Sequence, residues 1–128
     1  MTHYHAVVWI DHSEAKVLSF NADDVDESIV RPANPHVHVH HKAGVTGPGK
    51  DTPDVHFMRK VADSLHPFGE ILIAGPGTAK TELAEFIRQH DAGLSAKILG
   101  VQTLDHPSDG QIVAFGRKYF RAADRMRR

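Results

Sequence analysis

The chain has 128 residues, of which 41% are hydrophobic, so it can bury one sizeable core, and we expect a single domain over residues 1–128. It contains no cysteine, which excludes disulfide bonds and thiolate chemistry. The net charge is −1, but residues 117–128 hold six basic residues and one acid (+5), which leaves nine basic and fifteen acidic residues (−6) before them. No apolar run has membrane-spanning length and residues 1–5 show no targeting pattern, so we expect a soluble cytoplasmic protein without membrane contact.

The first part of the chain predicts three strands. Residues 5–10 (HAVVWI) are almost continuously apolar, as in a strand covered on both faces, and residues 15–20 are predicted as their hairpin partner. Residues 21–27 contain four acids and are predicted as a solvated connection. A third strand is predicted over about residues 28–41, at a sheet edge, because its two prolines cannot donate ladder hydrogen bonds.

A loop and a helix follow the third strand. Residues 41–51 contain three glycines, a proline and two lysines, so we expect a mildly basic loop without regular structure. Thr52-Pro53-Asp54 then provides a cap, a proline at the first helical position and an acid, which together predict a helix start. The apolar residues that recur at helical spacing after it are Phe57, Met58, Val61, Ala62 and Leu65.

Residues 70–91 (EILIAGPGTAKTELAEFIRQHD) predict a buried strand, a tight turn at Gly75-Pro76-Gly77 and an amphipathic helix capped by Thr78. Backbone N–H groups at such a turn meet a positive helix end, which is a physical basis for holding an anion. The turn does not match a nucleotide-binding P-loop, because that motif needs glycine where this chain has Ala74 and Ala79. The predicted inner face of the helix comprises Leu83, Phe86, Ile87 and His90, and Gly93 is predicted to close it.

Residues 97–104 predict the last strand, and Asp105-His106-Pro107 predicts the start of the last helix. Basic residues at spacings of four, four and three suit phosphate contacts, and equally suit a solvated helix end whose dipole favours cations. They are Arg117, Arg121, Arg125 and Arg128. The predicted core positions of this helix are Ile112, Phe115, Tyr119, Phe120 and Ala123, and Trp9 is predicted in the core as well.

The element order predicts an α/β fold with a mixed five-stranded sheet, strand order 3-2-1-4-5, strand 2 antiparallel and helices on both faces. The carboxyl ends of strands 1, 3, 4 and 5 would then lie at one edge of the sheet. The segments that would lie close together there are residues 11–12, the loop 41–51, the turn 75–78 and residues 105–106. Strands 1 and 4 are neighbours whose connections diverge. Open α/β sheets usually bind ligands at such a point, so function is expected there.

Three segments, AVVWIDHSEAKVLSF, ILIAGPGTAKTELAEFI and LDHPSDGQIVAFGRKYF, resemble in order and spacing the middle domain of archaeal and eukaryotic class 1 peptide-release factors and of the ribosome-rescue factor Pelota. They are more similar still to stand-alone bacterial translational machinery proteins. The resemblance spans about residues 4–120 and implies a three-layer ribonuclease H-like α/β/α fold and a non-enzymatic role in translation with the ribosome or structured RNA as partner. If the protein binds the ribosome or structured RNA, the expected RNA- or anion-binding residues are Lys42, Lys50, Gly75, Gly77, Thr78, Lys80, Arg117, Arg121 and Arg125.

True release factors carry a GGQ tripeptide in the loop after the third strand, where it positions a water on the peptidyl ester. The corresponding segment here, HKAGVTGPGK at residues 41–50, contains neither adjacent glycines nor a glutamine. Peptide release is therefore not expected, and no catalytic residue is assigned.

A histidine cluster supports an alternative of a different class. His36, His38 and His40 alternate with valines, so on a strand they would share one face and could chelate a divalent metal ion. A metal-binding protein or metal-dependent hydrolase is the alternative function, and no other cofactor is predicted. An exposed polar face, or a cation cluster that depends on pH, would explain the same residues. A third metal ligand could come from His3, His5 or His56.

The sequence supports two enzyme hypotheses, a nuclease and a Ser-His-Asp hydrolase, less well than the metal-binding alternative. A ribonuclease H-like nuclease needs several carboxylates around two metal ions. Asp11 would be the first candidate, but no second acid is placed beside it, and Asp105 and Asp109 more simply begin a helix. Ser13, His12 and Asp11 are consecutive, and consecutive side chains cannot form a Ser-His-Asp triad by themselves. The edge of the third strand could in addition pair two copies into a homodimer.

Overall fold

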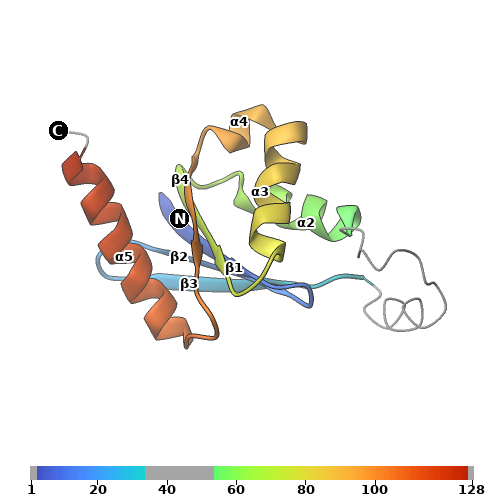
Figure 1. Cartoon of the computed structure of the whole chain (residues 1–128). Coiled ribbons are helices and arrows are strands. Elements are labelled where there is room, and N and C mark those ends of the chain that lie inside the picture. The colour runs from blue at the N-terminus through green and yellow to red at the C-terminus, as the bar shows by residue number, and fades with distance from the viewer. Residues whose placement is uncertain (1–2, 34–53, 127–128) are drawn as a thin grey trace.

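The structure is a computed structural model that describes residues 3–33 and 54–126. Within these ranges the chain folds into a five-stranded sheet with helices on both faces (Figure 1). The strands are β1 (His5–Ile10), β2 (Ala15–Phe20), β3 (Val25–Val30), β4 (Glu70–Gly75) and β5 (Ile98–Thr103). The helices are α2 (Val55–Leu65), α3 (Ala79–His90), α4 (Ala92–Ser95) and α5 (Asp109–Met126).

The strand order is β3-β2-β1-β4-β5, which confirms the predicted topology. β1 pairs antiparallel with β2 and parallel with β4, β2 pairs antiparallel with β3, and β4 pairs parallel with β5. The central strands β1 and β4 are the most apolar and are buried on both faces. Their continuous apolar runs are therefore explained by the two helical layers that cover them.

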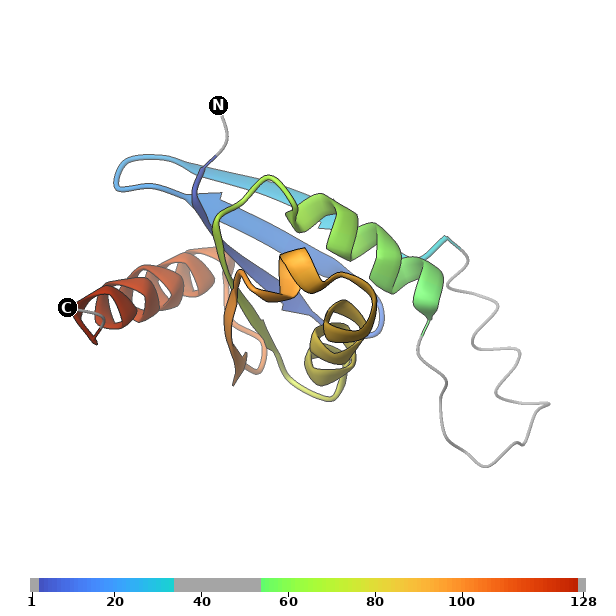
Figure 2. The ribbon, with the colours of Figure 1, turned by 90° about the horizontal axis from the view of Figure 1, so that it is seen from above.

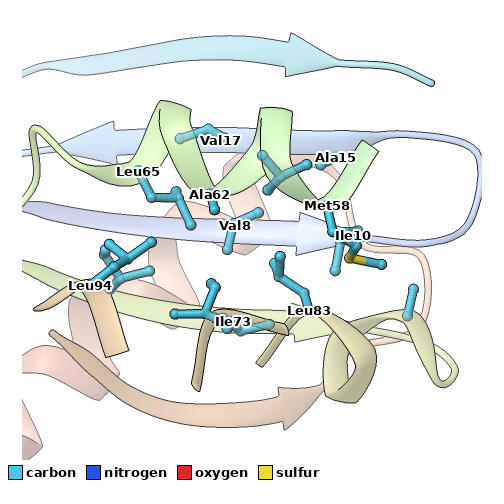
Figure 3. Packing of buried hydrophobic residues seen from close by; sticks show 14 of the residues in the cluster. Val8, Ile10, Ala15, Val17, Met58, Ala62, Leu65, Ile73, Leu83 and Leu94 are labelled. Atoms are coloured by element: carbon cyan, nitrogen blue, oxygen red, sulfur yellow. The ribbon is translucent and has the colours of Figure 1, made fainter. Parts of the chain in front are cut away.

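Two apolar clusters fill the space between the sheet and the helices. The first cluster lies between the sheet and helices α2 and α3, where Val8 and Ile73 from the strands contact residues such as Leu65 and Leu83 from the helices (Figure 3). The second cluster lies on the other face, under α5. Figure 2 shows the same division, with α5 apart from α2 and α3 across the sheet. The fold is thus a three-layer α/β/α arrangement.

Side-chain hydrogen bonds at the N-termini of α2 and α5 set where these helices begin, and the sequence indicated only some of these bonds. The Asp54 side chain caps α2 by accepting a hydrogen bond from the Phe57 N–H (3.0 Å). At the start of α5, the Gln111 N–H donates to Ser108 Oγ (3.2 Å) and the Ser108 N–H donates to Gln111 Oε1 (2.9 Å). This reciprocal pair is a capping box, and it places the start of α5 four residues after Asp105.

The predicted limits of the third strand are wrong. β3 spans Val25–Val30 instead of starting at residue 28, and residues 34–41 lie outside the described part of the chain. The Asn21 side chain accepts hydrogen bonds from the N–H groups of Asp23 (2.8 Å) and Asp24 (2.7 Å), so the turn closes early and pairing with β2 begins at Val25. The acids suggested a loop, but an exposed edge strand accommodates charged side chains equally well.

Two predictions about helices also need correction. Gly93 does not close α3, because α3 ends at His90 and Gly93 lies inside the short helix α4, which the Asp91 side chain caps by accepting from the Leu94 N–H (3.2 Å). On α5 the predicted inner face is rotated, and Phe115, Tyr119 and Ala123 are only half buried. The residues of α5 that are buried are Ile112, Val113, Gly116 and Phe120.

Candidate nucleic-acid interface

The carboxyl ends of β1, β3, β4 and β5 meet at one edge of the sheet, as the topology predicted. The turn after β4 is held tightly at this edge. A Cβ atom at Gly75 would lie 2.2 Å from the carbonyl oxygen of Ile10, and the Gly75 carbonyl accepts a hydrogen bond from the Leu104 N–H (3.0 Å). Gly75 therefore connects the ends of β1 and β5, and its lack of a side chain permits the close approach.

The predicted anion position at the start of α3 is next to a carboxylate of the chain itself. Glu82 Oε1 lies 3.0 Å from His12 Nε2, and Glu82 Oε2 accepts a hydrogen bond from the Thr78 hydroxyl (3.3 Å). Thr78 precedes the helix as predicted, but its side chain does not cap it. Lys80 donates to the carbonyl of Gly77. Gly77 and Thr78 are exposed, so an external anion could approach them, but it would meet the negative charge of Glu82.

An aromatic pair lies beside this turn. The buried Trp9 indole donates a hydrogen bond to the carbonyl of Leu104 (3.1 Å), and the exposed His106 ring lies with its centroid 5.5 Å from the Trp9 ring. The prediction that Trp9 is a core residue is confirmed, since only 5% of it is exposed. The predicted meeting of residues 11–12, 75–78 and 105–106 at one edge is confirmed as well.

A charged cluster that the sequence did not indicate adjoins the same edge on the α5 face. Lys16 Nζ lies 3.1 Å from Asp109 Oδ1. This hydrogen bond raises the pKa of Lys16 and lowers the pKa of Asp109. Partial burial, together with a hydrogen bond to Asp109, raises the pKa of Glu27. These residues come from β2, β3 and α5, so no local pattern could have identified the cluster.

The basic C-terminal helix end is only partly available for contacts. Arg117 is half buried: its Nη2 donates to the carbonyl of Asn21 (2.9 Å), and its guanidinium lies 5.6 Å from the centre of the Phe20 ring. Its Nε atom is buried and has no hydrogen-bond partner among the described residues. Arg121 and Arg125 are exposed. Arg117 therefore fastens α5 to the β2–β3 turn, and the two later arginines remain as surface cations.

The structure does not bring the predicted turn and the predicted basic residues together. α5 begins at the edge where β5 ends and returns along the sheet, so its C-terminal end lies at the opposite edge from the turn between β4 and α3 (Figure 1). The contact between the Phe120 and His5 rings (4.5 Å), at the start of β1, confirms this placement. A ligand that contacts both the start of α3 and the end of α5 would have to reach from one end of the strands to the other (Figure 1).

Several predicted site residues lie outside the described residues. They are Lys42 and Lys50 of the loop, the possible metal ligands His36, His38 and His40, and Arg128. The loop and metal hypotheses therefore remain predictions. Within residues 3–33 and 54–126, no group of three or more His, Cys, Asp or Glu side chains could hold a metal ion.

The residues considered for enzyme chemistry have structural roles where the chain is described. Asp11 Oδ1 accepts hydrogen bonds from the Ser13 N–H and hydroxyl (both 2.8 Å) and from the Glu14 N–H (3.0 Å), which stabilises the β1–β2 turn. Asp105 is exposed and contacts the adjacent His106 (3.1 Å). Ser13 donates to Asp11 and not to His12, which is paired with Glu82.

Neither a family model nor a curated protein matches the sequence. Solved structures, in contrast, share the arrangement of β3-β2-β1-β4-β5 with its flanking helices. The fold is the one found in a domain of Pelota and of archaeal and yeast proteins related to translation termination.

Three solved structures illustrate the similarity. Pelota from Archaeoglobus fulgidus has a TM-score of 0.63 and 15% identity over 89% of this chain. The archaeal translation termination factor aRF1 has a TM-score of 0.56 and 14% identity over 82% of this chain, and Dom34 of S. cerevisiae, a translation termination-like factor, has 0.57 and 9% over 87%. The aligned region is only 30–31% of those chains. At these identities the similarity establishes the fold.

Proposed function

We propose that this chain is a non-enzymatic ribosome- or RNA-associated protein that works in translation. The observation that carries the proposal is the shared fold: most of the chain matches one domain of Pelota, aRF1 and Dom34. Of these, aRF1 is a translation termination factor, and Dom34 is a termination-like factor involved in RNA quality control. The absence of a GGQ tripeptide from residues 41–50 supports a binding role without peptide release. None of the helices in residues 3–33 and 54–126 combines the length and the hydrophobicity of a membrane-spanning segment.

The exposed arginines near the C-terminus support phosphate contacts. Arg121 and Arg125 are one helical turn apart on α5 and both are exposed. Contacts of this kind supply affinity that depends on salt and not on base sequence, because they release counterions from the nucleic-acid backbone. The loop lysines Lys42 and Lys50 would supply contacts of the same kind elsewhere in the chain.

The test is co-sedimentation of the untagged protein with ribosomes at low and at high salt. The proposal expects a ribosome-bound fraction at low salt that high salt releases. Protein that stays in the supernatant at both salt concentrations, and that binds no structured RNA, would overturn the proposal.

Two double variants then separate the candidate surfaces. Arg121→Ala with Arg125→Ala removes the exposed charges of α5, and Lys42→Ala with Lys50→Ala removes those of the loop. Each is compared with Arg59→Ala plus Arg88→Ala, a matched control that removes two exposed cations from α2 and α3. We expect at least one of the first two variants to weaken binding and to reduce its salt dependence, while the control binds normally. Equal loss in all three would indicate non-specific attraction.

The contribution of the turn after β4 is tested by a substitution that should strengthen binding, whereas the preceding variants should weaken it. If phosphate binds near Thr78 and Lys80, the carboxylate of Glu82 repels it, and Glu82→Gln should strengthen ribosome or RNA binding. Unchanged or weaker binding by Glu82→Gln would remove the turn from the proposed contact surface and leave the arginines of α5 and the loop lysines.

A further inference from the structure

β3 presents an unpaired edge at one side of the sheet (Figure 2). It pairs with β2 along all six residues, and among residues 3–33 and 54–126 no strand pairs with its other side. Five of its six residues are exposed, and Val30 is half buried. The backbone N–H and C=O groups along such an edge are able to pair with another extended chain.

The face of β3 on the side of α5 carries apolar side chains that this helix does not cover. Val25 and Glu27 pair with Phe20 and Leu18, which both pack under α5, so they lie on that face together with Ile29. Val25 is 45% exposed and Ile29 is 42% exposed. An added strand with apolar residues at alternate positions would cover both side chains.

The opposite face of β3 borders a hollow of about 200 Å³. Asp26 and Ser28 of β3 line it, together with His3 and Ser19. Ser19 is buried and its hydroxyl lies 2.9 Å from Nδ1 of His3, whose side chain is 8% exposed. The Asp26 carboxylate is 3.9 Å from the same nitrogen, and its side chain is 74% exposed. Val17, Pro67 and Phe68 line the hollow as well, so it combines apolar walls with a few polar groups and an exposed carboxylate.

The charge of this edge favours a basic occupant. Asp23, Asp24, Asp26 and Glu27 lie in or next to the strand, and Lys16, the nearest lysine across the ladder, is already paired with Asp109. A second copy of the chain would bring another acidic strand to this edge, and like charges on paired strands are destabilising. Cationic side chains on the added strand would instead face these carboxylates.

We propose that the edge of β3 binds an extended, lysine- or arginine-containing segment of another protein as an additional strand. In this mode, backbone hydrogen bonds supply affinity, and pockets for alternate side chains supply specificity. A lysine of the added strand opposite Asp26 reaches the hollow, and apolar residues at other positions cover Val25 and Ile29. This site is formed by β3 and the residues around it, and the proposal does not depend on the proposed ribosome contacts.

The test uses a fluorescent peptide, Ser-Ile-Val-Thr-Lys-Lys-Val-Ser, whose central six residues place the two lysines opposite Glu27 and Asp26 in an antiparallel pairing with β3. The control peptide has glutamate at both lysine positions. We expect fluorescence anisotropy to show saturable binding of the lysine peptide and none of the glutamate peptide. Hydrogen exchange should become slower in the complex for the backbone amides of residues 25–30 that face away from β2, because these edge groups are then paired.

Asp26→Asn and Asp23→Asn provide matched variants, because each removes one charge and Asp23 lies in the turn outside the strand. We expect Asp26→Asn to weaken binding of the lysine peptide roughly two- to fivefold, the range of an exposed ion pair, and Asp23→Asn to change it by less.

The proposal is overturned if the lysine peptide does not bind, if the glutamate peptide binds equally well, or if both variants weaken binding to the same extent. A homodimer in sedimentation equilibrium, with slow exchange of residues 25–30 in the absence of peptide, would identify a second copy as the occupant and would also overturn it.

Discussion

Gly116 of α5 lies so close to Val7 of β1 that a Cβ atom at position 116 would be 2.6 Å from Val7 Cγ2. The same atom would be 2.8 Å from the Phe20 ring. The helix therefore rests on the sheet at this glycine, and the position of α5 decides where Arg117, Arg121 and Arg125 lie.

Gly116→Ala is expected to destabilise the protein by about 1–2 kcal/mol, because the overpacking outweighs the gain in helix propensity. Gly110→Ala on the same helix is the control, since nothing lies within 4 Å of a Cβ there, and it should stabilise by about 0.5 kcal/mol. Urea unfolding followed by the fluorescence of Trp9 measures both changes. Two variants of equal stability would contradict the proposed close contact.

Gly75→Ala is expected to destabilise by about 1–3 kcal/mol, because its methyl group would meet the backbone carbonyl of Ile10, which cannot rotate away as a side chain can. Gly77→Ala changes the same turn, but nothing lies within 4 Å of its Cβ, and it should change the unfolding free energy by less than about 0.5 kcal/mol. The same urea titration distinguishes the two. A larger loss for Gly77→Ala would show that the turn is limited by backbone conformation instead of by contact with β1.

Asp109→Asn tests the ion pair with Lys16. The hydrogen bond from Lys16 holds the pKa of Asp109 below its ordinary value of 3.8, so the carboxylate stabilises the fold above that pH and loses this effect as the pH falls through the lowered pKa. Because the Asp109 side chain is 44% exposed, we expect a loss of only about 0.5–1 kcal/mol at pH 7. Urea unfolding at pH 7 and pH 3 should show the difference from the unchanged protein shrinking at the lower pH, whereas Asp105→Asn should have little effect at either.

Glu27→Gln should act in the opposite direction. Partial desolvation of the largely exposed Glu27 carboxyl group, followed by its hydrogen bond to Asp109, raises the pKa of Glu27 above 4.5, so its ionisation at neutral pH opposes folding. The neutral glutamine is expected to stabilise the protein at pH 7, by less than about 1 kcal/mol because the side chain is exposed, and this gain should vanish below pH 4.5. A Glu27→Gln variant that is less stable than the unchanged protein at pH 7 would contradict the raised pKa of Glu27.

Much of the fold could be predicted because it depends on neighbours in the sequence. The apolar spacing of Phe57, Val61 and Leu65 marks the buried face of α2, and all three are buried. The strand order followed from the succession of elements and from the handedness of strand crossovers. The limits of β3 could not be predicted in this way, because acids are compatible with both a loop and an edge strand, and the Asn21 turn decided between them.

The positions of candidate site residues could be predicted only for residues that directly follow a strand. That Gly75 and Asp105 meet at one edge follows from the parallel strands β4 and β5. In contrast, the bond between Arg117 and the Asn21 carbonyl joins residues 96 positions apart, and the Lys16–Asp109 pair joins residues 93 apart. Such contacts depend on how α5 packs against the sheet, and helical periodicity does not contain that information.

The sequence by itself therefore determined the elements, their order and the edge at which the strands end, because periodicity, caps and connection rules act over short distances along the chain. Only the tertiary structure decided that the turn after β4 and the exposed arginines of α5 lie at opposite ends of the strands. It also decided that the unpaired side of β3, at the lateral edge of the sheet, is acidic. The reason is that packing between distant segments sets the distances between charges, and those distances decide which surface is able to bind.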